Sequence, residues 1–181
     1  MYHGARFVLK VAMLSLGWIF LFRLNSIIFA ALELTPRATL IFLPAALRVL
    51  YPLVFRHAGI AALLIGSFLV LPDSEGTLLH RLTLAGLSTL APVIGIVLCR
   101  TVRPIRLDLA GLTPADLFSL SIVCAVAHSL LLNAYLIAVG YPLQPLAHLL
   151  TVFVGDVLGT LIVLFGVATA LSFVAARNHR R

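Results

Sequence analysis

Apolar residues run along this chain in long, nearly unbroken stretches, and short segments between them hold most of the charges. A helix needs about 17–25 predominantly apolar residues to cross a bilayer. Six stretches can be drawn on this basis, at residues 6–31, 38–55, 58–71, 82–99, 114–139 and 146–176. The pattern predicts an all-α membrane protein: one domain over residues 1–181, a bundle of about six transmembrane helices, and no soluble domain.

The second and third stretches are the weakest of the six. Residues 38–55 contain Pro44 and Pro52 with Arg48 between them, and residues 58–71 are shorter than a full crossing requires. They form either two broken helices or a re-entrant hairpin. Non-helical backbone at membrane depth is tolerated only where protein or a wet cavity covers it.

Cations are distributed unequally between alternate connections. With the N-terminus in the cytoplasm, nine cations fall on the inside and only Arg37 and Arg81 on the outside. The nine are Arg6, Lys10, Arg56, Arg100, Arg103, Arg106, Arg177, Arg180 and Arg181. Cytoplasmic segments carry an excess of Lys and Arg, so we expect both termini in the cytoplasm.

The composition places almost the whole chain in the membrane. Hydrophobic residues make up 62% and charged residues 10%, with a mean hydropathy of +1.14, against about 25% charged residues in soluble domains. The net charge is +7, and most of the basic residues lie between the apolar stretches. Contact with anionic lipid explains this placement better than binding to nucleic acid does. We expect membrane lipids as partners, no nucleic acid, no cofactor and no metal, because neither Cys99 nor Cys124 belongs to a ligand cluster.

One carboxylate, Asp156, lies inside the last apolar stretch, far from any other acidic or basic residue. A charge at such a depth costs at least ~2.5 kcal/mol unless it is paired or hydrated. Arg48 lies at a similar depth and is the preferred partner, and Arg23 is the second choice. The pair is either an ion pair that locks the bundle, a ligand or ion site in an outward cavity, or part of a proton relay.

Three further polar residues are secondary candidates. His128 and Asn133 lie five positions apart on the fifth stretch, so they face different ways, and hydrogen-bonded packing is expected for the histidine. His148 falls near the helical stripe of Asp156, which suits a proton path, whereas two ligands without a third do not make a metal site. Gly155 and Gly159 form a GxxxG pattern that predicts close approach of another helix.

Residues 113–116, Thr-Pro-Ala-Asp, predict a helix start. Thr113 would be the N-cap, proline would occupy the first helical position, and Asp116 would meet the positive end of the helix dipole. Asp116 is therefore expected to have a structural role.

Two regions together resemble a known family. They are Phe42-Leu-Pro-Ala-Ala-Leu-Arg-Val-Leu50 with the glycine-containing residues 55–68, and Phe153-Val-Gly-Asp-Val-Leu-Gly-Thr-Leu161. Both are similar, in order and spacing, to motifs of the membrane-associated sensor (MASE, first type) domains, W-P-P-A-G and W-x-G-D-x-L-G. Leu43-Pro44 replaces the family's double proline, and this chain has fewer stretches.

The resemblance implies a bacterial inner-membrane sensory module. Such domains are usually fused to histidine kinase or cyclic-diguanylate output domains, and no such domain follows here, so a separate partner is expected to supply the output. The expected function is non-enzymatic: a sensory or partner-binding module within a larger membrane assembly. The alternatives are a small-molecule-binding subunit of a transporter, or an accessory subunit of a respiratory or photosynthetic complex. The sequence contains no GxSxG, HExxH, P-loop or GxGxxG motif.

Overall fold

The fold was analysed in a computed structural model, which describes residues 2–35, 38–72, 74, 76–102, 113–142 and 144–178. Side chains of residues 2, 3, 102, 114 and 168–178 lie outside this description, as do Arg37, Arg103, Arg106, Arg180 and Arg181 of the charge pattern. The elements are α1 (Tyr2–Ile28), η1 (Ala30–Leu32), β1 (Glu33–Thr35), β2 (Ala38–Thr39), α2 (Ala45–Phe55), α3 (His57–Val70), α4 (Leu78–Val102), α5 (Pro114–Ala138) and α6 (Pro145–Asn178).

Four of the helices are long and apolar enough to cross a membrane. They are the spans Gly4–Ile28, Leu78–Thr101, Ala115–Ala138 and Pro145–Val167. The expected helical chain is therefore confirmed, and four of its described helices are candidates to cross a membrane by length and composition. The helices α2 and α3, with 11 and 14 residues, are about 16 and 21 Å long, against a hydrocarbon core of about 30 Å.

The connection between α1 and α2 is not helical, and it includes the first residues of the stretch 38–55, which was expected to be part of two broken helices or of a re-entrant hairpin. A 3₁₀ turn is followed by a two-stranded antiparallel ribbon in which Glu33 pairs with Thr39. The helix begins only at Ala45, after Pro44, because proline is well tolerated at a helix start and poorly within one. The expected helical boundary at residue 38 is wrong by seven residues.

The helices α2 and α3 form a tight hairpin. The chain reverses at Arg56, whose φ of 47° lies in the left-handed region that non-glycine residues seldom adopt. Gly59 then brings α3 against the carbonyl group of Tyr51, where a Cβ atom would overlap it. The two alternatives for this doubtful pair of stretches, two broken helices that cross and a re-entrant hairpin, both stay predictions.

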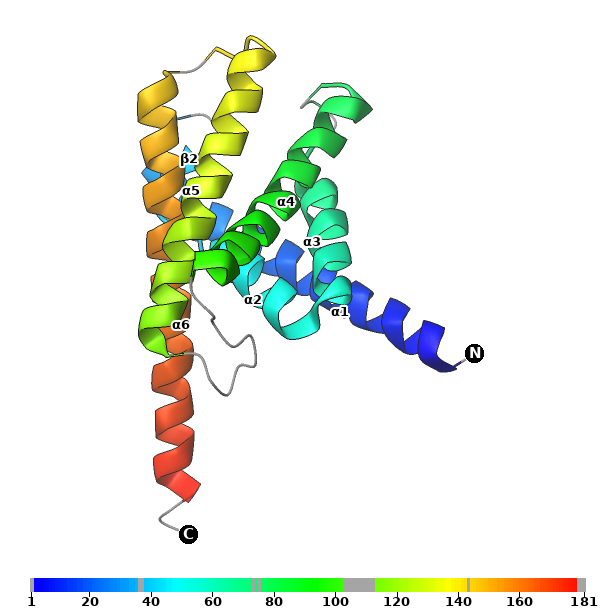
Figure 1. Cartoon of the computed structure of the whole chain (residues 1–181), viewed down its shortest axis with the longest axis vertical. Coiled ribbons are helices and arrows are strands. Elements are labelled where there is room, and N and C mark those ends of the chain that lie inside the picture. The colour runs from blue at the N-terminus through cyan, green and yellow to red at the C-terminus, as the bar shows by residue number, and fades with distance from the viewer. Residues whose placement is uncertain are drawn as a thin grey trace.

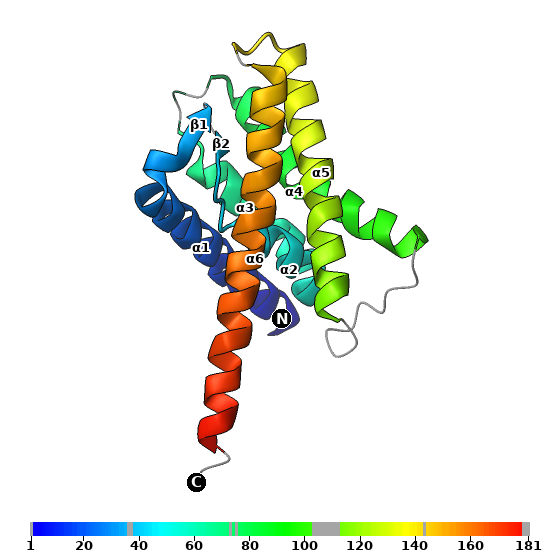
Figure 2. The same cartoon turned by 90° about the vertical axis from the view of Figure 1, so that its left-hand side faces the viewer.

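The helices α5 and α6 run side by side in opposite directions, while α1 crosses them at a steep angle (Figures 1 and 2). Both chain ends, the end of α4 and the start of α5 lie toward one end of the molecule. The β1–β2 ribbon, the end of α3 and the start of α6 lie toward the other end. The helix α5 starts with the expected capping box, in which Asp116 N–H donates to the Thr113 hydroxyl.

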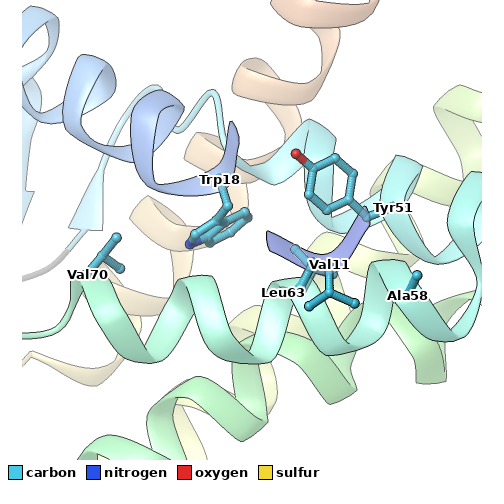
Figure 3. Packing of buried hydrophobic residues seen from close by; sticks show 7 residues of the cluster. Val11, Trp18, Tyr51, Ala58, Leu63 and Val70 are labelled. Atoms are coloured by element: carbon cyan, nitrogen blue, oxygen red, sulfur yellow. The ribbon is translucent and has the colours of Figure 1, made fainter. Parts of the chain in front are cut away.

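Packing between α1 and α3 forms the main apolar core (Figure 3). Its buried members are Val11, Trp18, Tyr51, Ala58, Ala62, Leu63 and Val70. A Cβ atom at Gly66 would lie 2.7 Å from the Trp18 ring, so this glycine allows the contact. Gly95 plays the same part beneath Cys124, whereas Gly86 has no neighbour within 4 Å.

Candidate functional site

Arg48 and Asp156 meet inside the bundle, as their depth in the sequence predicted. Arg48 lies on α2 and Asp156 on α6, and Nη1 of the arginine donates to both carboxylate oxygens at 3.0 and 2.9 Å. Their side chains are only 9% and 6% exposed. Arg23, the second choice, is exposed on α1 and lies at a cavity that the pair also lines. The structure therefore selects Arg48 as the partner.

His128, on α5, is the third member of this cluster. Its Nδ1 lies 2.7 Å from Asp156 Oδ2 and 3.0 Å from Arg48 Nη1. An ionised carboxylate only accepts hydrogen bonds and a guanidinium only donates them. The shorter contact therefore assigns the Nδ1 proton to His128, which donates to Asp156. Hydrogen-bonded packing was expected for this histidine, which was only a secondary candidate, and the structure places it in the site.

Two aromatic rings cover the Arg48 guanidinium. Its Cζ lies 4.8 Å from the ring centroid of Phe42 and 5.6 Å from that of Trp18. Both distances fall within the range of cation–π attraction, worth about 0.5–2 kcal/mol each according to desolvation. The two rings also contact each other edge-to-face, with centroids 6.5 Å apart. Arg48 is thus held by charge on one side and by aromatic faces on the other.

The GxxxG pattern around Asp156 receives an extended segment rather than another helix. A Cβ atom at Gly155 would overlap the carbonyl oxygen of Thr39, and one at Gly159 would overlap that of Phe42. The Phe42 N–H also donates to the Gly155 carbonyl at 3.0 Å. The two glycines were predicted to admit a helix, and this is wrong. They admit bare backbone, which brings the Phe42 ring against Arg48.

Asn133 and His148 form a separate polar pair between α5 and α6. His148 Nδ1 lies 3.0 Å from Asn133 Oδ1, and the Asn133 amide donates to the Ser129 carbonyl at 2.8 Å. Both side chains are buried. Asn133 and His128 therefore do face different partners. Within the described ranges there is no group of three or more His, Cys, Asp or Glu that could hold a metal ion.

A cavity of about 360 Å³ lies over the ion pair. Arg48, His128 and Asp156 line it at depth, and Glu33 and Pro72 line it nearer the end of the molecule that carries the ribbon. The further lining residues come from α1, β2, α3, α4, α5 and α6 and from two connections: Trp18, Phe22, Arg23, Asn25, Ser26, Ala38, Thr39, Phe42, Ser67, Val70, Leu71, Leu84, Ala85, Ser88, Leu132 and Val152. On the α4–α5 side of the pair a space of only about 10 Å³ remains, which holds no more than about one water.

Three residues of the cavity wall each have a buried donor atom that does not face the cavity and has no hydrogen-bond partner within the described part of the chain. The three donors are the indole N–H of Trp18, the Nε–H of Arg48 and the hydroxyl of Ser67. All three residues are more than nine-tenths buried. Buried polar groups are hydrogen-bonded in the great majority of cases, so exceptions need an explanation. Trp18 and Ser67 were not candidates from the sequence; a lone tryptophan within an apolar stretch was the available signal.

Comparisons with known proteins found no match. No protein-family model, no curated protein and no solved structure matches it. The similarity to membrane-associated sensor domains therefore rests on the two sequence regions alone.

Proposed function

We propose that this chain is a non-enzymatic membrane protein that binds a small molecule in the cavity over Arg48 and Asp156. Binding would be reported to a partner membrane or signalling protein, which makes the chain a sensory or partner-binding module. The observation that carries the proposal is a cavity of about 360 Å³ that is lined by apolar side chains and by the Arg48–Asp156 ion pair. Ligand pockets span about 300–1,000 Å³ and combine apolar walls with a few polar groups.

The bonding of the charged groups supports binding rather than catalysis. Both oxygens of Asp156 accept from Arg48, and one also contacts His128. A general acid or base must be placed to exchange a proton with a substrate. Here the carboxylate is engaged from two sides, so it holds α2, α5 and α6 together at the floor of the cavity.

The origin of the cavity walls supports a sensory role. Trp18 comes from α1, Ser67 from α3, Ser88 from α4, Leu132 from α5 and Val152 from α6. An occupant would touch all five helices, and a ligand shifts a conformational equilibrium through such differential contacts. A partner protein bound to the outer surface of the helix bundle would respond to this change in conformational equilibrium.

One observation favours the transporter alternative. The extended residues before α2 reach the cavity through Thr39 and Phe42, and interrupted helices of this kind form the midplane sites of many transporters. Identification of proteins that co-purify in mild detergent separates the candidates. A kinase or cyclase supports the sensory module, an ATPase pair the transporter subunit, and a stoichiometric large complex the accessory subunit.

The orientation in the membrane forms part of the proposal. We place the chain in a bacterial inner membrane, multi-pass, with both termini in the cytoplasm. The α2–α3 hairpin adds either two crossings or no crossing, so α4, α5 and α6 keep their directions in both cases. Only the side of Arg56 changes, and the remaining cations still favour the inside by eight to two.

Native mass spectrometry of the purified protein tests the binding function. A small molecule should co-purify, and Ser26→Trp should remove it, because Ser26 is exposed and lines the cavity. Met13→Trp is the matched control, since Met13 is exposed on the same helix and does not line the cavity. An occupant that survives Ser26→Trp, or a protein that carries no small molecule in any preparation, would refute the proposal.

A further inference from the structure

Arg23 is a cation within the first apolar stretch, and its side chain is exposed. The nearest acid along the sequence, Glu33, is ten positions away. Within the described ranges no carboxylate forms an ion pair with the Arg23 guanidinium. A charge in such a stretch is costly unless it is hydrated or paired. The partner of Arg23 is therefore water or a group that the described chain does not supply.

Arg23 differs from the other charges that line the cavity. Arg48 is neutralised by Asp156 at 2.9 Å, and both side chains are buried. Glu33 has an interaction of its own. Arg23 lines the same cavity with an exposed side chain, so its positive charge is available to an occupant. A guanidinium binds carboxylates and phosphates through two parallel hydrogen bonds, so an acidic group suits it best.

Apolar side chains line the cavity beside Arg23. On α1, Phe22 adjoins it, and Trp18 lies five residues earlier, about 7.5 Å along the helix axis away from the ribbon. Leu84 of α4 and Leu132 of α5 add aliphatic surface, and burial of an apolar chain against such groups is favourable. A volume of about 360 Å³ holds roughly a dozen non-hydrogen atoms at the ~30 Å³ that one water occupies in the liquid.

We infer, on the basis of the proposed function, that the ligand is an amphiphile with an acidic head group and an apolar chain. The Arg23 guanidinium binds the head group, a carboxylate or a phosphate, and the chain lies in the cavity beside Phe22 and Trp18. A free acid and a membrane phospholipid both offer this chemistry. Amines and uncharged alcohols of the same length are disfavoured, because neither supplies the negative charge.

Quenching of Trp18 fluorescence by brominated amphiphiles in maltoside micelles tests the inference. Trp18 is the single tryptophan, lines the cavity and is only 1% exposed, so a probe that merely dissolves in the micelle reaches it poorly. The probes are ω-bromooctanoate and ω-bromooctanol, which share a chain and differ in charge. Arg23→Gln should weaken quenching by the acid by roughly five- to twenty-fold, between the values for an exposed ion pair and a buried charge-assisted hydrogen bond. Quenching by the alcohol should be unchanged.

Lys10→Gln is the matched control, because Lys10 is an exposed cation of the same helix that does not line the cavity. Both probes should quench this variant as they quench the wild type. Unlabelled octanoate should also displace the brominated acid at lower concentration than octylamine does. Equal loss of acid binding in the two glutamine variants, equal loss of acid and alcohol in Arg23→Gln, stronger displacement by octylamine, or no quenching by the acid would each overturn the inference.

The same assay in phosphatidylglycerol nanodiscs identifies the source of the acidic group. An effect of Arg23→Gln that persists there supports a free acid, because the probe then competes successfully with the lipid. An effect that is present in micelles and lost in nanodiscs supports a lipid phosphate at Arg23. The proposed function fails separately, if Ser26→Trp leaves a co-purified molecule in place.

Discussion

Replacement of one member of the Arg48–Asp156 pair should destabilise the bundle far more than replacement of both. The guanidinium lies 2.9 Å from the carboxylate, and both side chains are more than nine-tenths buried. Removal of one partner leaves the other charge buried without compensation, which costs about 3–5 kcal/mol. We therefore expect losses of this size for Arg48→Met and for Asp156→Leu.

The double variant, Arg48→Met with Asp156→Leu, shows whether the two residues stabilise the protein as an ion pair or independently of each other. The sum of the two single losses is roughly 6–10 kcal/mol, whereas apolar residues that pack together in place of a buried pair are often neutral or stabilising. The double variant still leaves the buried Nδ1–H of His128 without its acceptor, which costs about 1–3 kcal/mol, so its loss should be of this size and far below the sum. Arg48→Met keeps a long side chain against Phe42 and loses only the cation–π attraction, about 0.5–2 kcal/mol.

Unfolding in a graded SDS titration provides the measurement. The chain contains a single tryptophan, Trp18, which contacts Arg48 and reports on this part of the bundle by its fluorescence. Arg23→Met is the control, because Arg23 is exposed, and a change within about 0.5 kcal/mol is expected there. A loss below about 1 kcal/mol in the Arg48 variant, or a double variant as unstable as the sum, would refute the reasoning.

The remaining predictions concern the extended segment that lies on α6. Gly159→Ala should destabilise the protein by about 1–3 kcal/mol, because the new methyl group overlaps the backbone of this segment. Gly166→Ala, on the same helix with no neighbour within 4 Å, should be neutral or stabilise by up to about 1 kcal/mol, and equal losses in the same SDS titration would contradict the predicted packing. Asn25→Ala should cost about 1–3 kcal/mol, because the buried Asn25 carbonyl accepts from Leu43 N–H at 2.8 Å. Limited proteolysis measures this loss, and Asn25→Ala should speed cleavage of residues 38–44. Ser26→Ala, at the exposed neighbouring position, should leave the cleavage rate unchanged. Faster cleavage in both variants would show that the hydrogen bond from Leu43 to Asn25 is not responsible.

The pattern of apolar residues along the chain was sufficient to predict the long helices and the pairing of Arg48 with Asp156. Lipid-facing helices need long apolar stretches whatever their neighbours, so α1, α4, α5 and α6 follow from local composition. Asp156 is the one acid in its stretch and Arg48 lies at a similar depth, so the cost of an unpaired charge was enough to join them.

The same pattern could not predict the conformation of residues 38–44 or the partner that packs against Gly155 and Gly159 of α6. Apolar composition is the same for a membrane helix and for an extended segment covered by protein. Only the carbonyl groups that lie against Gly155 and Gly159 show that this segment is extended. A GxxxG pattern predicts close packing against the helix, but it does not identify the packing partner as a helix or as an extended segment.

The sequence by itself determined the helical membrane class, the capped start of α5 and the depth of the buried charges, because each depends on residues close together in the chain. Tertiary structure decided that His128 joins Arg48 and Asp156, and that Trp18 and Ser67 line the same cavity. These outcomes depend on how each helix is rotated about its axis against its neighbours. That rotation is set by packing across the whole bundle and not by any single stretch.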